Sequence, residues 1–341
     1  MTEVSEGRHG ATVATLGALL DQWIMHIEAV GRSPKTLAEY RRKVERAIRP
    51  GLGSIRLDKL TAHHLDAWYR SLVASGTSSA TVMHYHRIIA ASLHQGERWG
   101  WVRHNVSRLA QPPPVPRKEL TVPPPERVRA LIDAAASSRS PEMATIITVA
   151  ALTGLRRGEL CGLRWSDVDW TESTVTVRRS IWQVASEWGP KDPKTHQVRR
   201  LVLGEHAMAV LGGRWQRVMA TANAAEVSIT PNAYVFSPVV DGGRPIMPNT
   251  VTRAFSILCD RMAVLAAKAE PPRVESWPYR FHDLRHYTAT ELFRAGHNPR
   301  TVADRLGHAD PALTLRVYTH DTEDQARAAA HSLEAGLTVS G

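Results

Sequence analysis

The stretch Gln111-Pro-Pro-Pro-Val-Pro-Arg-Lys-Glu-Leu-Thr-Val-Pro-Pro-Pro125 divides the chain into two parts. Proline fixes the backbone dihedral φ and lacks an N–H donor, so we expect residues 111–125 to form an extended, semi-rigid linker. The segments on either side, 12–110 and 126–320, are each long enough to bury a core of their own. The sequence therefore predicts two domains, with an N-terminal tail at residues 1–11.

Positive charge is concentrated before the linker. The 341 residues include 43 Lys+Arg and 33 Asp+Glu, which gives a formal net charge of +10. Residues 1–110 hold 15 basic and 9 acidic side chains, a net +6, whereas residues 123–341 hold 26 and 23, a net +3. An excess of cations favours a polyanionic partner, and nucleic acid is the first candidate.

Residues 12–110 have the pattern of a small helical domain. Apolar side chains recur with the period of an α-helix, and capping residues stand where helices would begin. The predicted helices run from Leu16 to Val30, from Ser33-Pro34 to about Ile48, from Thr61 to about Gly76 and from Ser79 to Leu93.

Two of these helices carry basic and aromatic side chains suited to binding the phosphates of DNA. Helical phase alone does not choose among the candidates, and an ordinary solvated surface is the alternative interpretation. The residues that we predict to contact DNA are Lys35, Tyr40, Arg41, Lys43, His84 and Arg87.

Residues 126–320 combine helical segments with a few short strands, which predicts a mainly α fold with a small antiparallel β-sheet. Thr174–Arg178 and Val198–Leu203 alternate apolar and polar side chains, and they suggest a hairpin with the polar loop Ser186–His196 between its strands. Tyr234–Phe236 is a further strand candidate. Helices are expected near residues 125–135, 141–152, 206–221, 251–267 and 282–295, and from residues 157, 298 and 310 onward.

The sequence argues against metal, disulfide and membrane chemistry. Cys161 and Cys259 form neither a disulfide framework nor a zinc cluster. His282-Asp-Leu-Arg-His286 has the histidine spacing of zinc proteases but lacks their glutamate and a third ligand, so we expect no metal and no cofactor. No early segment matches a signal peptide or a membrane span, so we expect a cytoplasmic protein without a membrane partner.

Side chains that can act on a phosphate recur in short motifs of the second domain. Arg156 follows a glycine turn in Thr153-Gly-Leu-Arg-Arg-Gly-Glu-Leu160, with Glu159 three residues later on the same helical face. Lysine is rare in this chain, yet Lys191 and Lys194 both lie in the polar loop. The six candidates are Arg156, Lys194, His282, Arg285, His308 and Tyr318.

The order and spacing of these motifs resemble the tyrosine recombinase (phage integrase) family. The matching motifs are T-G-L-R-R-G-E-L at Arg156, P-K-T at Lys194, H-D-L-R at His282–Arg285, L-G-H at His308 and Y-T-H at Tyr318. The resemblance covers about residues 12–335. It implies a helical core-site DNA-binding domain at 12–110 and a catalytic domain at 126–320, with neither ATP nor a metal required.

The resemblance also implies a role for each candidate. Tyr318 would be the nucleophile that forms a 3′-phosphotyrosine, with Tyr287 as its rival in this sequence. Lys194 would protonate the leaving 5′-oxygen, with Lys191 as its rival, and His282 would manage the proton of Tyr318.

The remaining candidates would stabilise charge on the phosphate. Arg156 and Arg285 present planar guanidinium groups to the non-bridging oxygens, and His308 adds a further hydrogen bond. Glu159 would orient the arginine and the histidine and take no part in the chemistry itself.

The family implies partners as well as chemistry. Residues 321–337 form an expected alanine-rich helix that packs either on its own domain or on a neighbouring protomer of a homotetramer. The DNA partners would be double-stranded recombination sites, and a DNA-bending or excision protein would be an accessory partner. A mobile-element integrase is the favoured role, with a Xer-type chromosomal resolvase and a type IB topoisomerase-like enzyme as alternatives.

Overall fold

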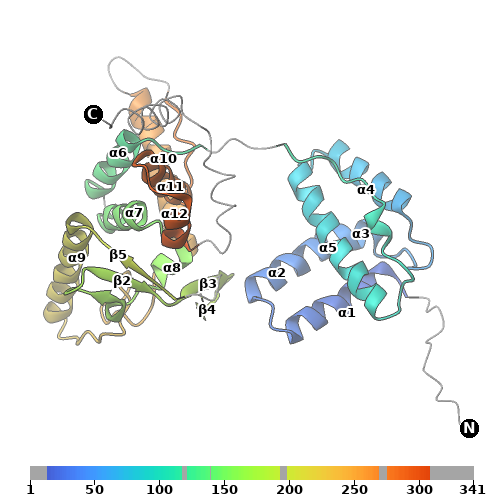
Figure 1. Ribbon diagram of the computed structural model, residues 1–341, viewed down its shortest axis with the longest axis horizontal. Helices are drawn as coiled ribbons and strands as arrows, with labels where there is room; N and C mark the ends of the chain where they lie inside the picture. Colours follow the sequence, from blue (N-terminus) through green and yellow to red (C-terminus); the bar gives the residue numbers. More distant parts are fainter. Residues whose placement is uncertain (1–13, 117–120, 139, 193–197, 269–274, 308–341) are drawn as a thin grey trace, which may run out of the picture. The chain divides into compact units, whose positions relative to one another are not determined.

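The computed structural model describes residues 14–116, 121–138, 140–192, 198–268 and 275–307. The chain forms two compact units, Met1–Glu119 and Leu120–Gly341, which divide within the proline-rich stretch. Figure 1 shows a first unit built from helices and a second unit that adds short strands to its helices. The mainly α fold with small antiparallel sheets agrees with the sequence prediction.

The first unit packs its helices around one apolar core. Leu19, Ile48, Leu65 and Ile89 are fully buried in it. Hydroxyl side chains accept hydrogen bonds from backbone N–H groups at the starts of the four longer helices, and the caps at Ser33 and Thr61 are those that the sequence predicts. The helices are α1 (Leu16–Ala29), α2 (Pro34–Lys43), α3 (Arg49–Leu52), α4 (Ala62–Ala74) and α5 (Ser79–Arg98).

The second helix reaches Ile48 as predicted, but the last five residues of that range are π-helical and the helix continues to Leu52. A π-helical turn, Val44–Ile48, follows α2 and leads into α3. Pro50 is the second residue after this turn. Because proline has no N–H and its ring crowds the carbonyl one turn earlier, a regular α-helical hydrogen bond cannot form there, which accounts for the wider turn.

The second unit is organised around α7, which packs against α6, α9 and α11. Most of the α7 side chains are buried, so this helix forms the centre of the core. The helices are α6 (Pro125–Ala136), α7 (Glu142–Thr153), α8 (Arg157–Cys161), α9 (Glu205–Ala224), α10 (Pro248–Ala267), α11 (Asp283–Arg294) and α12 (Pro299–Leu306).

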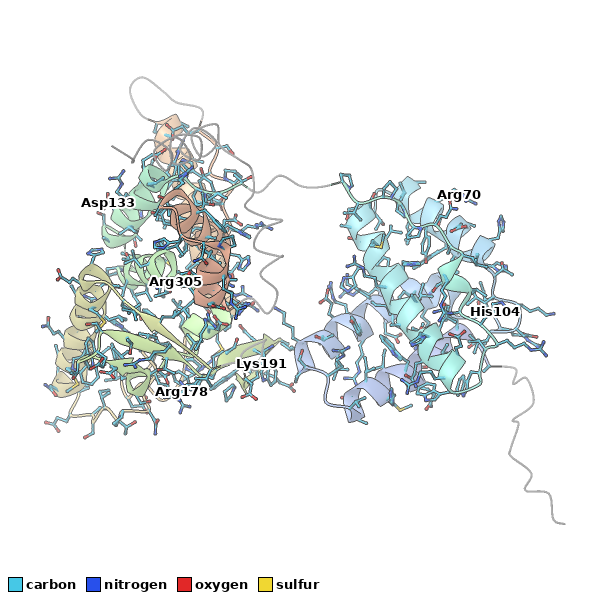
Figure 2. The ribbon with its side chains drawn as sticks, viewed as in Figure 1. Arg70, His104, Asp133, Arg178, Lys191 and Arg305 are labelled. Atoms are coloured by element: carbon cyan, nitrogen blue, oxygen red, sulfur yellow. The ribbon has the colours of Figure 1, made fainter. Side chains whose placement is uncertain are left out.

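Two small antiparallel sheets lie beside these helices. One has the order β1–β2–β5, in which β2 pairs with β5 as the alternating residues predict. The other is the hairpin β3–β4, and Figure 2 shows Lys191 on this hairpin. The strands are β1 (Val168–Asp169), β2 (Thr174–Val177), β3 (Ser180–Val184), β4 (Glu187–Lys191) and β5 (Arg199–Val202).

Two strand expectations were wrong. Part of the expected loop Ser186–His196 is strand β4, which pairs with β3 even though it contains Gly189 and Pro190. Proline is tolerated because β4 has a partner on one side only. Tyr234–Phe236 forms no strand: Tyr234 makes a single isolated bridge to Arg164, and the segment bonds irregularly to its neighbours.

No helix in the described part of the chain is long and apolar enough to cross a membrane. The expected helices from residue 310 onward and at residues 321–337 lie outside the described residues.

Candidate active site

The carboxyl end of α7 is held by side chains from two other helices. Gly154 ends this helix in the left-handed region, with φ of +66°, and a Cβ there would lie 2.5 Å from Leu306 Cδ2. Thr288 Oγ1 donates to the carbonyl of Ala151 at 2.8 Å, and Arg285 Nη1 donates to that of Gly154 at 2.7 Å. These bonds satisfy carbonyls that have no partner within the helix, and they fix α11 against α7.

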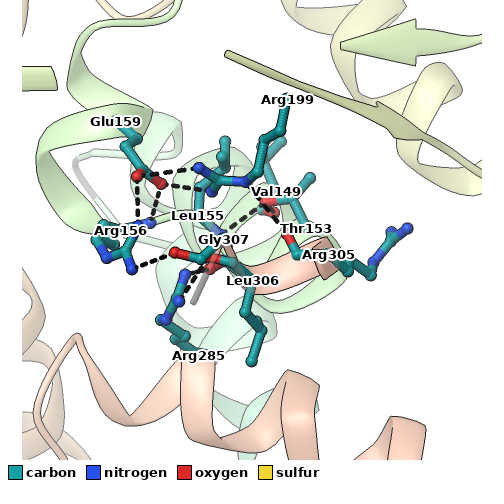
Figure 3. A network of polar contacts seen from close by, with 11 residues as sticks. Val149, Thr153, Leu155, Arg156, Glu159, Arg199, Arg285, Arg305, Leu306 and Gly307 are labelled. Atoms are coloured by element: carbon teal, nitrogen blue, oxygen red, sulfur yellow. Dashed lines mark hydrogen bonds and ion pairs between the residues drawn. The ribbon is translucent and has the colours of Figure 1, made fainter. Parts of the chain in front are cut away.

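Arg285 and Arg156 meet at the carboxyl end of α12. Arg285 Nη2 donates to the carbonyl of Leu306 at 2.6 Å, and Arg156 Nη2 donates to that of Gly307 at 2.7 Å. Figure 3 shows both guanidinium groups reaching this end of the helix. The fold therefore joins the T-G-L-R-R-G-E-L, H-D-L-R and L-G-H motifs at one place.

Glu159 fixes the orientation of Arg156. Its buried carboxylate accepts Arg156 Nη1 at 2.9 Å on Oε1 and the Arg156 backbone N–H at 2.9 Å on Oε2. Burial alone would raise the pKa of Glu159, but hydrogen bonds from Arg199 and the charges of both arginines lower it below its ordinary value. Glu159 is thus an anion at neutral pH, and it orients the cation beside it.

His282 directly precedes α11 and remains accessible to solvent. The protein around it nevertheless desolvates the imidazole, and this effect, with the nearby positive charges of His286 and Arg285, lowers its pKa to about 4. The His282 and His286 rings are 5.1 Å apart, edge to face. At neutral pH the imidazole of His282 is therefore uncharged.

Three of the six candidates, Lys194, His308 and Tyr318, lie outside the described residues. The chain positions beside two of them are described: Gly307 ends α12 just before His308, and Lys191 ends β4 three residues before Lys194. Tyr287, the rival nucleophile, lies on α11, where it is partly buried against the core and burial raises its pKa.

Sequence reasoning missed Arg199 and Arg305. Arg199 begins β5 and donates to both oxygens of Glu159, at 3.1 and 2.6 Å. Arg305 lies in the last turn of α12 and donates to the carbonyls of Leu152 and Val202. Nothing in the spacing of these arginines separates them from the many surface arginines, because their partners are brought to them by the fold.

Of the six residues predicted to contact DNA in the first unit, three lie together in a cluster and three lie apart from it. Tyr40 stacks on Trp23 at 5.4 Å and meets the edge of His84 at 6.2 Å. Glu39 lies 3.6 Å from both Lys43 Nζ and His84 Nδ1. Three candidates, Tyr40, Lys43 and His84, are therefore brought together between α2 and α5.

The other three candidates lie apart from this cluster. Arg41 pairs with Glu28 of α1, in an ion pair where both side chains are 48% exposed. Lys35 and Arg87 are exposed and make no ion pair with another residue that the structure describes. These two cations have the greatest freedom to bind an incoming phosphate.

Comparison with known proteins identifies the family of this chain. The Phage integrase family matches residues 124–325, and the phage integrase N-terminal SAM-like domain matches residues 15–73. The chain belongs to the phage integrase family of tyrosine recombinases. Enzymes of this family cleave and rejoin DNA.

Relatives of this tyrosine recombinase include a XerC-like recombinase and an integrase. A XerC-like tyrosine recombinase of Caldanaerobacter subterraneus is 24% identical over 90% of this chain and 79% of that protein. The ICEBs1 integrase of Bacillus subtilis is 24% identical over 77% of this chain and 68% of that protein.

Solved structures share the fold of this recombinase. The Tn1549 transposon integrase in complex with a circular intermediate DNA has a TM-score of 0.78, with 21% identity over 94% of this chain and 99% of that one. A lambda integrase tetramer bound to a Holliday junction has a TM-score of 0.66, with 18% identity over 91% of this chain and 80% of that one.

Proposed function

We propose that this chain is a site-specific DNA recombinase that integrates or excises a mobile element. The observation that carries the proposal is the convergence of Arg156 and Arg285 on the end of α12, directly before His308. Two guanidinium groups fixed side by side are suited to the non-bridging oxygens of one phosphate. Their anchors are backbone carbonyls and a buried carboxylate, so the site is organised before DNA arrives.

The proposed cleavage step uses only side chains of this chain. The phenolic oxygen of Tyr318 attacks the phosphorus, and the bond from phosphorus to the 5′-oxygen breaks. Lys194 gives a proton to that oxygen, while His282 receives the proton of Tyr318. Arg156, Arg285 and His308 stabilise the charge of the transition state, and the product is a 3′-phosphotyrosine that the reverse reaction can reseal.

The first unit would hold the duplex beside this site. We propose that Lys35, Tyr40, Arg41, Lys43, His84 and Arg87 contact the DNA backbone. Four copies on two duplexes would complete recombination, in agreement with the lambda integrase tetramer named above. A DNA-bending or excision protein would set the direction of the reaction.

The nucleophile assignment can be tested before the target site has been identified. A library of nicked random duplexes is incubated with the protein, SDS-resistant adducts are recovered, and the attached DNA is sequenced. Wild type should give adducts in the presence of EDTA. Tyr318→Phe should give none, whereas the control Tyr287→Phe should keep them. Adducts that persist in Tyr318→Phe would contradict the assignment.

The recovered DNA also separates the alternative functions. A single enriched sequence found at the boundary of a mobile element supports an integrase, while enrichment of a chromosomal resolution site supports a Xer-type enzyme. Relaxation of plasmids that lack any enriched site would support a topoisomerase-like enzyme.

A further inference from the structure

Strand β5 and helix α12 are joined by two arginines, one from each element, and each donates to a backbone carbonyl of the other element. Arg199 Nε, from β5, donates to the carbonyl of Arg305 at 3.2 Å. Arg305 Nη1, from α12, donates to the carbonyl of Val202 in β5 at 3.1 Å. We call this pair, Arg199 and Arg305, the arginine clamp; Figure 3 shows both side chains.

The remaining donors of the clamp extend it to the active site. Arg199 Nη1 and Nη2 donate to the two oxygens of Glu159, the same carboxylate that holds Arg156. Arg156 in turn donates to the carbonyl of Gly307, two residues along the chain from the carbonyl that Arg199 binds. The contacts form a closed ring through β5, α8 and the end of α12.

The clamp fits closely against Gly307. This glycine has φ of +67°, and a Cβ there would lie 2.8 Å from Arg199 Nη1 and 3.0 Å from Arg199 Cζ. The Arg199 side chain is only 9% exposed. The guanidinium group therefore packs directly on the backbone where the chain leaves α12, and a Cβ at position 307 would displace it from this place.

The two elements that the arginine clamp joins are close in sequence to three of the candidate catalytic residues. Residues 193–197, with Lys194, directly precede β5, and His308 and Tyr318 follow α12. We propose that Arg199 is a positioning residue for strand cleavage, which with Arg305 holds β5 and the end of α12 in place around Glu159 and Arg156. This inference rests on the proposed function, and it adds two residues to the six candidates.

Arginine is required here because the bonds need its geometry as well as its charge. Arg199 uses all three of its nitrogens at once, on the carbonyl of Arg305 and on both oxygens of Glu159. Lysine offers one nitrogen and can keep only part of this set. Arg199→Lys therefore retains the charge beside Glu159 and removes the link to α12.

The main test compares Arg199→Lys with Arg200→Lys. Arg200 is the next residue of β5 and bonds to Thr174 and Asp169, so it is a matched control away from the clamp. At saturating DNA, Arg199→Lys should form adduct about 10- to 100-fold more slowly, the range expected when hydrogen bonds to a charged group are lost. Its affinity for DNA should stay within about twofold of wild type, because the Arg199 side chain is only 9% exposed and its nitrogens bind other parts of the protein.

A second DNA substrate distinguishes misplacement of Arg156 from partial unfolding of the Arg199→Lys variant. When the scissile phosphate is replaced by a neutral methylphosphonate, the reaction depends less on the charge of Arg156. The defect of Arg199→Lys should therefore shrink on this substrate, whereas partial unfolding would slow both substrates equally. Equal slowing, or a wild-type rate on the phosphate, would overturn the proposal.

Two measurements on DNA-free protein test the arginine clamp independently of whether the protein cleaves DNA. Backbone amides of α12 should exchange with solvent faster in Arg199→Lys and Arg305→Leu than in Arg200→Lys; equal exchange would overturn the clamp even if no adduct forms. Gly307→Ala should also speed this exchange more than Gly296→Ala. Gly296 has φ of +82° with nothing within 4 Å of an added Cβ, so it reports the backbone cost alone.

Discussion

Arg41 of the first unit pairs with a carboxylate at the surface, whereas Arg285, at the candidate active site of the second unit, binds backbone carbonyls inside the protein. Arg41 and Glu28 are both 48% exposed in their ion pair. Arg285 is 3% exposed and donates to the carbonyls of Gly154 and Leu306. Surface pairs are weak and screened by salt, so those cations can exchange partners when DNA binds. The buried arginines are fixed by the fold.

The largest effect is expected from Arg285→Ala. The substitution removes the donors to two buried carbonyls, which should lower the free energy of unfolding by about 2–4 kcal/mol and abolish adduct formation. Arg294→Ala, on the same helix but 58% exposed, should change stability by less than about 0.5 kcal/mol. Urea unfolding measures both; equal midpoints for the two variants would break the contrast between buried and exposed arginines.

A smaller effect is expected in the pH dependence of stability. Because the folded pKa of Glu159 lies below its ordinary value of 4.5, its contribution is complete above pH 4.5 and is lost as pH falls through the folded pKa. The loss of stability in Glu159→Gln should therefore be greatest at pH 7 and should shrink as pH falls below 4.5.

Glu28→Gln, in the surface pair of the first unit, is the control for this measurement. Its exposed carboxylate should contribute little at any pH. Urea midpoints at pH 7 and at pH 3 give the comparison. If the difference in urea midpoint between wild type and Glu159→Gln is the same at pH 7 and at pH 3, the charge of the carboxylate is not what stabilises the site.

The smallest effect is expected from Lys35→Ala and Arg87→Ala in the first unit. Each should reduce the slope of log affinity against log salt by about 0.9, because one phosphate contact is lost. The rate of adduct formation at saturating DNA should not change, since neither residue belongs to the catalytic unit. A filter-binding titration at several salt concentrations measures the slope, and an unchanged slope would exclude these two cations as phosphate contacts.

Local sequence signals predicted most of the secondary structure. Helix starts at Ser33 and Thr61 depend on a side chain and a backbone N–H three residues away, so the sequence contains all that is needed. The secondary-structure predictions that were wrong concern segments whose conformation depends on residues distant in the sequence. Strand β4 forms despite Gly189 and Pro190 because β3 pairs with it, and Tyr234–Phe236 stays irregular because only one bridge to Arg164 forms.

By itself, the sequence determined the two-unit organisation, the family and the residue types of the candidate site, because proline runs and short motifs are local. Only the tertiary structure decided that Arg199 and Arg305 belong with that site. Their partners, Glu159 and the carbonyls of Leu152 and Val202, lie on other elements of the chain. Every residue has a backbone carbonyl, so the sequence does not show which carbonyl accepts a hydrogen bond from a distant arginine. The three-dimensional structure is therefore needed to identify Arg199 and Arg305.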